Sequence, residues 1–314
     1  MGIIRSLIPY HPDGVLMKAL LLLLLFVSFT ALQAQSDRWK SIREKTEIKL
    51  NEIANSTRGI VGVVALDMTS GEKFAVNSEM QLPQGSAIKI PILMEVFKMA
   101  HEGKFKLTDL FWVDSADHVG GSGILGQLGN HTTQMSVHDL SILMIVLSDN
   151  TATNMLIDLV GMENINKTLK EVGLSKTRVQ RKMMDQEASA RGDENLSTPM
   201  EAARIMEMLF KGTFVSREVC DEIIAILQKG KSGTIASALP PGIPVSFKPG
   251  GIAGVTTEWA IVHLKENPYV LVVMESYGLE GDINPAVSNI SKLIYEYFWR
   301  KGVASPYGSY DVKW

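Results

Sequence analysis

Hydrophobic residues form two kinds of pattern along the chain. Runs rich in β-branched residues, the signature of strands, lie towards both ends, and a Thr69–Gly71 turn between the first two predicts a hairpin. The predicted strands cover residues 59–68, 73–76, 244–248, 255–264 and 269–276.

Helical patterns occupy the middle of the chain and both flanks. A capping box, Ser136 to Asp139, opens an apolar stretch at 140–147 whose helix should be buried because it has no polar face. Glycines close two of the other helices, and Thr198-Pro199 opens another. The remaining predicted helices are Trp39 to Ala54, Ser86 to about Glu102 (closed by Gly103), Thr151 to Val160 (closed by Gly161) and Asn284 to Arg300.

This order predicts an α/β architecture of the α+β kind. One sheet, built from both chain ends and flanked by terminal helices, would carry an inserted all-helical lobe. We expect one domain over 35–314, with a sheet lobe at about 35–85 and 232–314 and a helical lobe at about 86–231.

The first segment is typical of an export signal. The apolar run from Ala19 to Leu32 follows Lys18, ends near a small residue, and is shorter than the stretch of about 20 residues that spans a bilayer. We predict cleavage after Ala34, a true start at Met17 with 1–16 a mis-assigned extension, and an exported, periplasmic or secreted protein. An uncleaved membrane anchor is the alternative.

Composition excludes several classes of function. The chain has 31 basic and 34 acidic residues and a net charge of −3, which gives no electrostatic basis for nucleic-acid binding. A single cysteine, Cys220, can form neither an internal disulfide nor a cysteine zinc site. We expect no metal, no cofactor, no stable membrane insertion after processing, and a monomer.

Candidate chemistry begins with Ser86-Ala-Ile-Lys89 at a predicted helix start. Residues three apart share a helix face, so a desolvated amine could activate the hydroxyl as a nucleophile. The motif is weak by itself, because Ser70 and Lys73 match it within a hairpin turn. Ser86 could equally be a helix cap with Lys89 on the surface.

Two further motifs follow in order. Ser148-Asp149-Asn150 lies between two predicted helices, and Lys248-Pro249-Gly250 ends a late strand. Each could be a plain turn. Together, S-x-x-K, S-D-N and K-x-G resemble class A β-lactamases and penicillin-binding proteins over about residues 38–302. The stretches at 121–128, 148–161 and 197–199 also resemble this superfamily.

The resemblance implies a β-lactamase/transpeptidase-like fold and a role for each motif residue. Ser86 would be acylated, Lys89 would help to deprotonate it, and Ser148 would relay a proton to the β-lactam nitrogen. Asn150 would hold Lys89 and the substrate amide, and Lys248 would supply positive charge. By the same resemblance, the backbone N–H groups of Ser86 and Gly251 would form the oxyanion hole, with Gly250 and Gly251 admitting substrate to the strand edge.

Three departures from the family pattern bear on mechanism. Pro249 replaces the usual Thr or Ser and offers neither hydroxyl nor N–H. The E-x-x-L-N loop of the deacylating glutamate is absent, leaving Asp185 and Glu187 as candidate carboxylates or merely solvated loop charges. Residues 256–258 are Thr-Thr-Glu where many members carry a basic residue, and Glu258 would repel a substrate carboxylate.

Three functions therefore remain open. The first is a β-lactamase-type serine hydrolase acting on small β-lactams. The second is a penicillin-binding D-alanyl-D-alanine peptidase, or another amide or ester hydrolase, with slow deacylation on a peptidoglycan-like substrate. The third is a non-catalytic binding protein that reuses the fold, since a fold alone does not establish activity.

Overall fold

A computed structural model describes residues 38–279, 283–305 and 307–310, in two compact units. The larger unit, 47–303, contains every strand described below and every labelled helix. In the smaller unit, residues 38–46 are helical, and the Arg38 guanidinium lies over the Tyr307 ring at 5.3 Å from its centroid. The predicted signal at 1–34 and the proposed start at Met17 lie outside the described residues.

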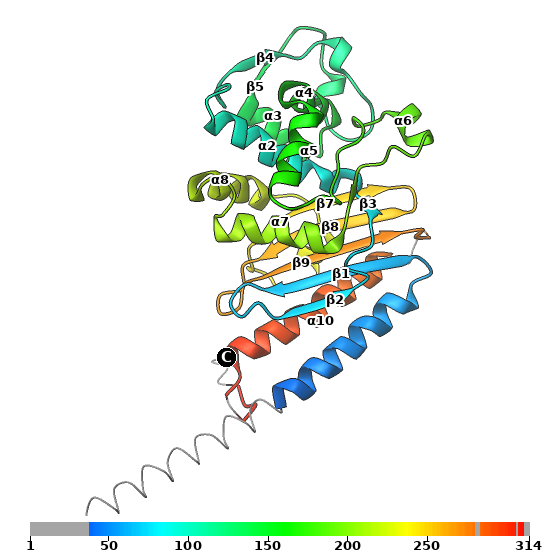
Figure 1. The fold of residues 1–314 in the computed structure, drawn as a ribbon, viewed down its shortest axis with the longest axis vertical. Helices are drawn as coiled ribbons and strands as arrows, with labels where there is room; N and C mark the ends of the chain where they lie inside the picture. Colours follow the sequence, from blue (N-terminus) through cyan, green and yellow to red (C-terminus); the bar gives the residue numbers. More distant parts are fainter. Residues whose placement is uncertain (1–37, 280–282, 306, 311–314) are drawn as a thin grey trace, which may run out of the picture. The chain divides into compact units, whose positions relative to one another are not determined.

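The centre of the larger unit is a five-stranded antiparallel sheet in the order β2-β1-β9-β8-β7 (Figure 1). It joins strands from both chain ends, which confirms the predicted architecture. The strands are β1 (Ile60–Asp67), β2 (Lys73–Val76), β7 (Val245–Ile252), β8 (Val255–Val262) and β9 (Tyr269–Ser276).

Burial explains why the central strands are apolar along their whole length. Every residue of β9 is buried, because helix α7 (Pro199–Lys211) packs on one face of the sheet and α10 (Ile283–Val303) on the other (Figure 1). A strand covered on both faces has no solvent-facing positions to alternate. The edge strand β2 does alternate between exposed and buried residues.

The segment between the sheet strands is mainly helical. The part predicted to be all-helical, 86–231, also contains the antiparallel pair β4 (Leu110–Trp112) and β5 (Gln134–Ser136). It contains β6 (Leu196–Ser197) as well, which pairs with β3 (Leu82–Pro83) just before this part. The remaining elements are η1 (Gly85–Ile88), α2 (Lys89–His101), η2 (Ser115–Asp117), η3 (Leu125–Gln127), α3 (Val137–Val146), α4 (Asn150–Val160), α5 (Met162–Glu171), α6 (Gln186–Ala190), α8 (Arg217–Gln228) and α9 (Thr234–Ser237).

Helix starts follow the predicted caps. The Ser136 hydroxyl accepts the Asp139 N–H at α3, and Thr198 accepts the Glu201 N–H at α7. The helix at 38–56 contains the predicted Trp39–Ala54. Burial of α3 is less complete than predicted, since Ile142 is only half-buried and Leu147, which follows the helix, is 47% exposed.

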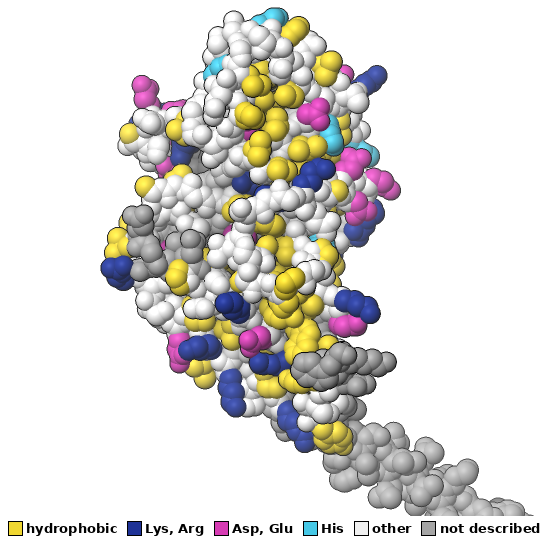
Figure 2. Space-filling model, turned by 180° about the vertical axis from the view of Figure 1, so that it is seen from behind, with side chains coloured by type: hydrophobic (Ala, Val, Ile, Leu, Met, Phe, Trp, Pro, Cys, Tyr) yellow, Lys and Arg dark blue, Asp and Glu magenta, His cyan; other side chains and the backbone are white. Residues whose placement is uncertain are grey.

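The described residues also show whether a helix could span a membrane and how charges are distributed. In the part of the chain that the structure describes, no helix combines the length and apolar character needed to cross a membrane. Basic and acidic side chains are interspersed on the face drawn in Figure 2.

Candidate active site

Ser86 lies in the 3₁₀ turn η1, immediately before Lys89 opens α2. The predicted helix from Ser86 therefore starts with a tighter turn. Ser86 is not its capping residue, because Gln84 occupies that position. Ser86 is half-buried and lines two adjoining clefts of about 580 and 560 Å³. This placement removes the interpretation of Ser86 as a simple helix cap.

Lys89 is fully buried and bound to the S-D-N motif. Its Nζ donates to the Ser148 carbonyl at 2.6 Å, to the Ser148 hydroxyl at 3.2 Å and to Asn150 Oδ1 at 2.9 Å. The interpretation of Lys89 as a surface lysine is therefore wrong. Among the described residues its bonds go to Ser148 and Asn150 and not to Ser86, so the structure contains no direct Ser86–Lys89 hydrogen bond.

Lys248 approaches the same serine from strand β7. Its Nζ donates to the Ser148 hydroxyl at 3.1 Å and to the Pro249 carbonyl at 2.7 Å, and the residue is 2% exposed. The Ser148 oxygen thus accepts from two amines, which leaves its own O–H free to donate elsewhere. Ser148 has a φ of +54°, a left-handed conformation uncommon outside glycine.

The surroundings lower the proton affinity of both amines. Burial lowers the pKa of Lys89 well below its ordinary value, and the charge of Lys248 lowers it further, while Asp149 acts in the opposite direction. Burial also lowers the pKa of Lys248, to about 7. The charge of Lys231 lowers the pKa of Lys248 further, while Glu258 acts in the opposite direction. A buried amine whose pKa is lowered in this way can serve as a base near neutral pH.

The aspartate between Ser148 and Asn150 organises the local backbone. Asp149 caps α4 through the Ala152 N–H, and its second oxygen accepts the N–H groups of Ile124 and Leu125 at 2.6 and 2.9 Å. It thereby fixes the loop that carries Ser122 into both clefts. The sequence carries a signal for this role, because an Asp directly before a helical run is a recognisable cap.

Close backbone packing defines the site next to Ser86. A Cβ on Gly250 would lie 2.4 Å from the Gln84 carbonyl oxygen and 2.5 Å from the Ala87 nitrogen. Gly250 therefore has to be glycine because of the chain's own backbone, whereas Gly251 is exposed with no such neighbour. Pro249 is accommodated because β7 is an edge strand.

The segment 181–195 forms one wall of the larger cleft. Asp185 lines the cleft and caps the short helix α6 through the Ala188 N–H, whereas Glu187 is exposed and not among the lining residues. A third carboxylate, Glu194, also lines it and pairs with Arg181 at 2.9 Å. Sequence reasoning missed this pair, because two charges 13 residues apart in a loop carry no pattern.

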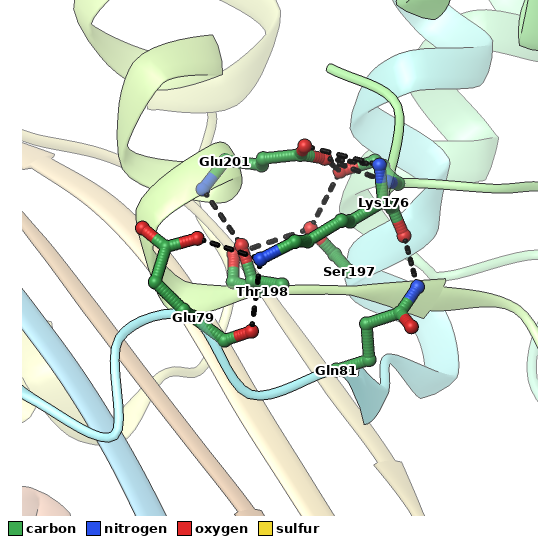
Figure 3. A network of polar contacts seen from close by, with 7 residues as sticks. Glu79, Gln81, Lys176, Ser197, Thr198 and Glu201 are labelled. Atoms are coloured by element: carbon green, nitrogen blue, oxygen red, sulfur yellow. Dashed lines mark hydrogen bonds and ion pairs between the residues drawn. The ribbon is translucent and has the colours of Figure 1, made fainter.

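A buried carboxylate holds the base of this wall. Glu201 accepts the backbone N–H groups of Lys176 and Thr177 and the Thr177 hydroxyl, which also bonds to Ser197 at 2.8 Å (Figure 3). Lys176 in turn pairs with Glu79 at 2.8 Å. The network joins the start of α7 to both ends of the 178–196 segment, so the cleft wall has a fixed base.

Glu258 lines the smaller cleft and is bound by the backbone of α9. It is 3% exposed, and its carboxylate accepts the backbone N–H groups of Thr234 and Ile235 at 2.9 to 3.2 Å. Burial raises its pKa to about 7 against the effect of those bonds and of Lys248 and Lys231. The expected repulsion of a substrate anion is therefore weakened, because the group is only partly ionised at neutral pH and is committed to α9.

Potential metal ligands are scattered among the described residues. Within them, no group of three or more His, Cys, Asp or Glu side chains could hold a metal ion, and Cys220 is buried. His131 pairs with Asp114 at 2.6 Å and stacks on Trp112, which makes it part of a surface cluster.

Comparison with known proteins shows the family to which the chain belongs. A model of the β-lactamase enzyme family matches residues 45–298. An imipenem-hydrolyzing β-lactamase of Enterobacter cloacae is 24% identical over 231 residues, 71% of this chain and 78% of the relative. The β-lactamase CARB-3 of Pseudomonas aeruginosa is 23% identical over 84% of this chain and 93% of the relative.

Solved structures share the fold. A β-lactamase from Sphaerobacter thermophilus superimposes with a TM-score of 0.75 at 28% identity, covering 81% of this chain and 97% of the other. A mutant of PBP-A, captured as an acyl-enzyme complex with penicillin G, also gives 0.75, at 23% identity, covering 83% and 97%. These matches confirm the resemblance predicted from the three motifs.

Proposed function

Because this chain belongs to the β-lactamase enzyme family, we propose that it is an exported serine hydrolase that opens β-lactam amides through an acyl-enzyme on Ser86. The observation that carries the proposal is the pair of buried amines, Lys89 and Lys248, that share the Ser148 hydroxyl beside Ser86. Burying two amines away from water costs free energy, and such costly arrangements are typical of catalytic sites.

In the proposed acylation, the Ser86 oxygen attacks the carbonyl carbon and its proton passes to neutral Lys89. Lys89 lies within hydrogen-bond distance of Ser148 rather than of Ser86, so it has to reach Ser86 by a small movement or through water. The oxyanion would be bound by the N–H groups of Ser86 and Gly251. Ser148 then gives its proton to the departing nitrogen and is reprotonated from a neighbouring amine.

A second candidate is a penicillin-binding peptidase whose acyl-enzyme is long-lived. The cleft wall favours it, because Glu194 is paired with Arg181 and Asp185 caps α6, so each carboxylate that lines this cleft is already engaged. The acyl-enzyme described for the PBP-A mutant is a precedent on the same fold. Slow hydrolysis after normal acylation would distinguish this function from a β-lactamase.

Intact-mass spectrometry of the chain without residues 1–34 tests both candidates. With penicillin G, we expect a covalent adduct that is absent in Ser86→Ala. An adduct that decays within seconds, with turnover of a chromogenic cephalosporin, supports the β-lactamase. An adduct that persists for hours supports the peptidase. If the wild-type protein neither forms an adduct nor hydrolyses esters, both candidates are wrong and a non-catalytic binding protein is the remaining function.

A further inference from the structure

The residue two positions before Ser86 is a fully buried glutamine with extensive bonding. The Gln84 backbone N–H donates to the Asn195 carbonyl at 3.0 Å, and its side-chain Nε2 donates to the Leu82 carbonyl at 2.6 Å. A buried amide is costly unless its polar atoms are satisfied. An apolar residue would fill this position at lower cost, so the glutamine calls for an explanation.

Two further bonds join Gln84 to strand β8, and its Nε2 also lies 3.2 Å from Met274 Sδ of β9 and 3.5 Å from the Ser197 carbonyl. Trp259 Nε1 donates to Gln84 Oε1 at 3.0 Å, and Thr257 Oγ1 donates to the Gln84 carbonyl at 2.8 Å. Thr257 and Trp259 are both fully buried and, two residues apart, lie on the same face of the sheet. Gln84 is therefore held to strand β8 at two points, one through its backbone and one through its side chain.

The register of the sheet connects these two points to the active site. Thr257 lies opposite Gly250, and Trp259 lies opposite Lys248. The two β8 residues that bind Gln84 are thus the direct partners of two site residues on β7. Gln84 directly precedes η1, so its bonds to β8 also hold η1 and Ser86 in place relative to β7.

Close backbone packing prevents η1 from shifting relative to β7. A Cβ on Gly85 would lie 2.8 Å from the Gly251 nitrogen, and one on Gly250 would lie 2.7 Å from Thr257 Oγ1. The turn before Ser86 and the strand at Gly251 are therefore in close contact, and a small shift of one displaces the other.

We propose that Gln84, Thr257 and Trp259 form a clamp that sets the spacing between the backbone N–H groups of Ser86 and Gly251. These are positioning residues, which touch no reacting atom and act through the two amides. The proposal rests on the proposed acylation of Ser86. Geometric errors of about 1 Å in such a site can cost about 100-fold in rate.

The test compares Thr257→Val with a matched control, Ser141→Ala. Both residues are fully buried, and each donates one hydroxyl hydrogen bond of 2.8 Å to a backbone carbonyl, but Ser141 does so within α3. Rapid-mixing kinetics with penicillin G separate the acylation rate constant from the dissociation constant that precedes it. For Thr257→Val we expect acylation to fall about tenfold or more, with the dissociation constant changed less than about threefold.

The control and the rescue complete the kinetic experiment. Ser141→Ala should acylate at the wild-type rate even if it unfolds at a lower temperature, and Thr257→Ser, which keeps the hydroxyl, should recover most of the rate. Trp259→Phe, which removes the indole donor, should slow acylation in the same way. A Thr257→Val protein that acylates as fast as the control would overturn the clamp.

A second readout does not depend on β-lactam chemistry. In amide NMR spectra of the free protein, Thr257→Val and Trp259→Phe should move the signals of Ser86 and Gly251, and Ser141→Ala should leave both in place. If the wild-type protein forms no penicillin adduct, the proposed function fails and these spectra alone decide the clamp. Unmoved signals in the two clamp variants would then overturn it.

Discussion

At the scale of single residues, the site depends on the sharing of one hydroxyl by two buried amines. Burial lowers the pKa of both lysines, and a neighbouring cation lowers each further, Lys248 in the case of Lys89 and Lys231 in the case of Lys248. The two lysines have different proposed tasks, because Lys89 has to be neutral to accept a proton while Lys248 has to be charged.

This difference predicts a pH profile. The pKa of Lys248 is about 7, so it is charged below that pH and neutral above it, and acylation should slow as pH rises through about 7. Lys248→Arg keeps its charge throughout this range and should remove the decline, whatever its absolute rate. Stopped-flow acylation between pH 5 and 9 provides the measurement. A decline that persists in the arginine variant would assign it to another group.

Two neighbouring glycines predict opposite effects of the same substitution. Gly250→Ala would place a methyl group 2.4 Å from the Gln84 carbonyl oxygen, so the turn before Ser86 and strand β7 would have to separate. We expect a loss of about 2 kcal/mol in unfolding free energy and nearly complete loss of acylation. Gly251→Ala meets its nearest atom at 3.7 Å and should unfold within about 0.5 kcal/mol of wild type. Urea denaturation compares them, and equal losses would refute this packing argument.

At the scale of elements, Glu258 joins β8 to the backbone of α9, and its titration makes the stability of the fold depend on pH. The pKa of Glu258 is raised by burial from 4.5 to about 7. Below 4.5 the carboxyl is neutral in both the folded and unfolded states. Between 4.5 and 7 the unfolded state ionises first, so the folded state loses stability as pH rises, by about 3 kcal/mol in total.

Glu258→Gln removes this ionisation while keeping one acceptor for the α9 backbone. The unfolding free energy of the variant, relative to wild type, should therefore improve by about 3 kcal/mol between pH 4 and pH 8. Urea denaturation at several pH values gives the difference directly, and Lys231 and Lys248 are present in both proteins. A difference that does not vary with pH would show that Glu258 is not held in its neutral form.

Elements were easier to predict than the contacts between them. Caps such as Ser136 and Thr198 act within four residues, and periodicity reveals β1 and β9, so these were correct from the sequence. The Gln84 contacts with β8 join residues more than 170 positions apart, and the Arg181–Glu194 pair depends on a loop path. No local pattern encodes such contacts. The motif order singled out Ser86, Lys89, Ser148 and Lys248, which the fold brings together around one cleft. The surroundings of Glu258 could be seen only in the fold.

At the scale of the whole molecule, the C-terminal helix is tied to the first hairpin. Lys301 Nζ, near the end of α10, binds Asp67 Oδ2 and Glu72 Oε2, both at 2.7 Å, and the Ser70 hydroxyl at 2.8 Å. The second S-x-x-K match lies in this contact, since Ser70 of the hairpin turn bonds to Asp67 of the same hairpin and to Lys301 of α10. The matching spacing in Ser70–Lys73 is coincidental.

Removing Lys301 would leave the fully buried Asp67 carboxylate without its counter-ion. Burial raises the pKa of Asp67, but hydrogen bonds from Lys301, Ser70 and Thr69 outweigh it and hold the pKa below 3.8. Asp67 therefore stabilises the fold above pH 3.8, and this contribution is lost as pH falls through the lowered pKa. We expect Lys301→Met to reduce the unfolding free energy by about 2 kcal/mol at pH 7, with a smaller deficit below pH 3.

Arg300→Met supplies the matched control, because Arg300 pairs with the exposed Glu296 one turn away at 2.9 Å and such surface pairs contribute less than about 0.5 kcal/mol. Urea denaturation of both variants at pH 7 and pH 3 makes the comparison. Equal losses of unfolding free energy would mean that the contact between α10 and the first hairpin depends on apolar packing alone. A deficit confined to Lys301→Met, and largest at pH 7, would show that this junction depends on charge, even though the sheet that it closes is assembled from apolar strands.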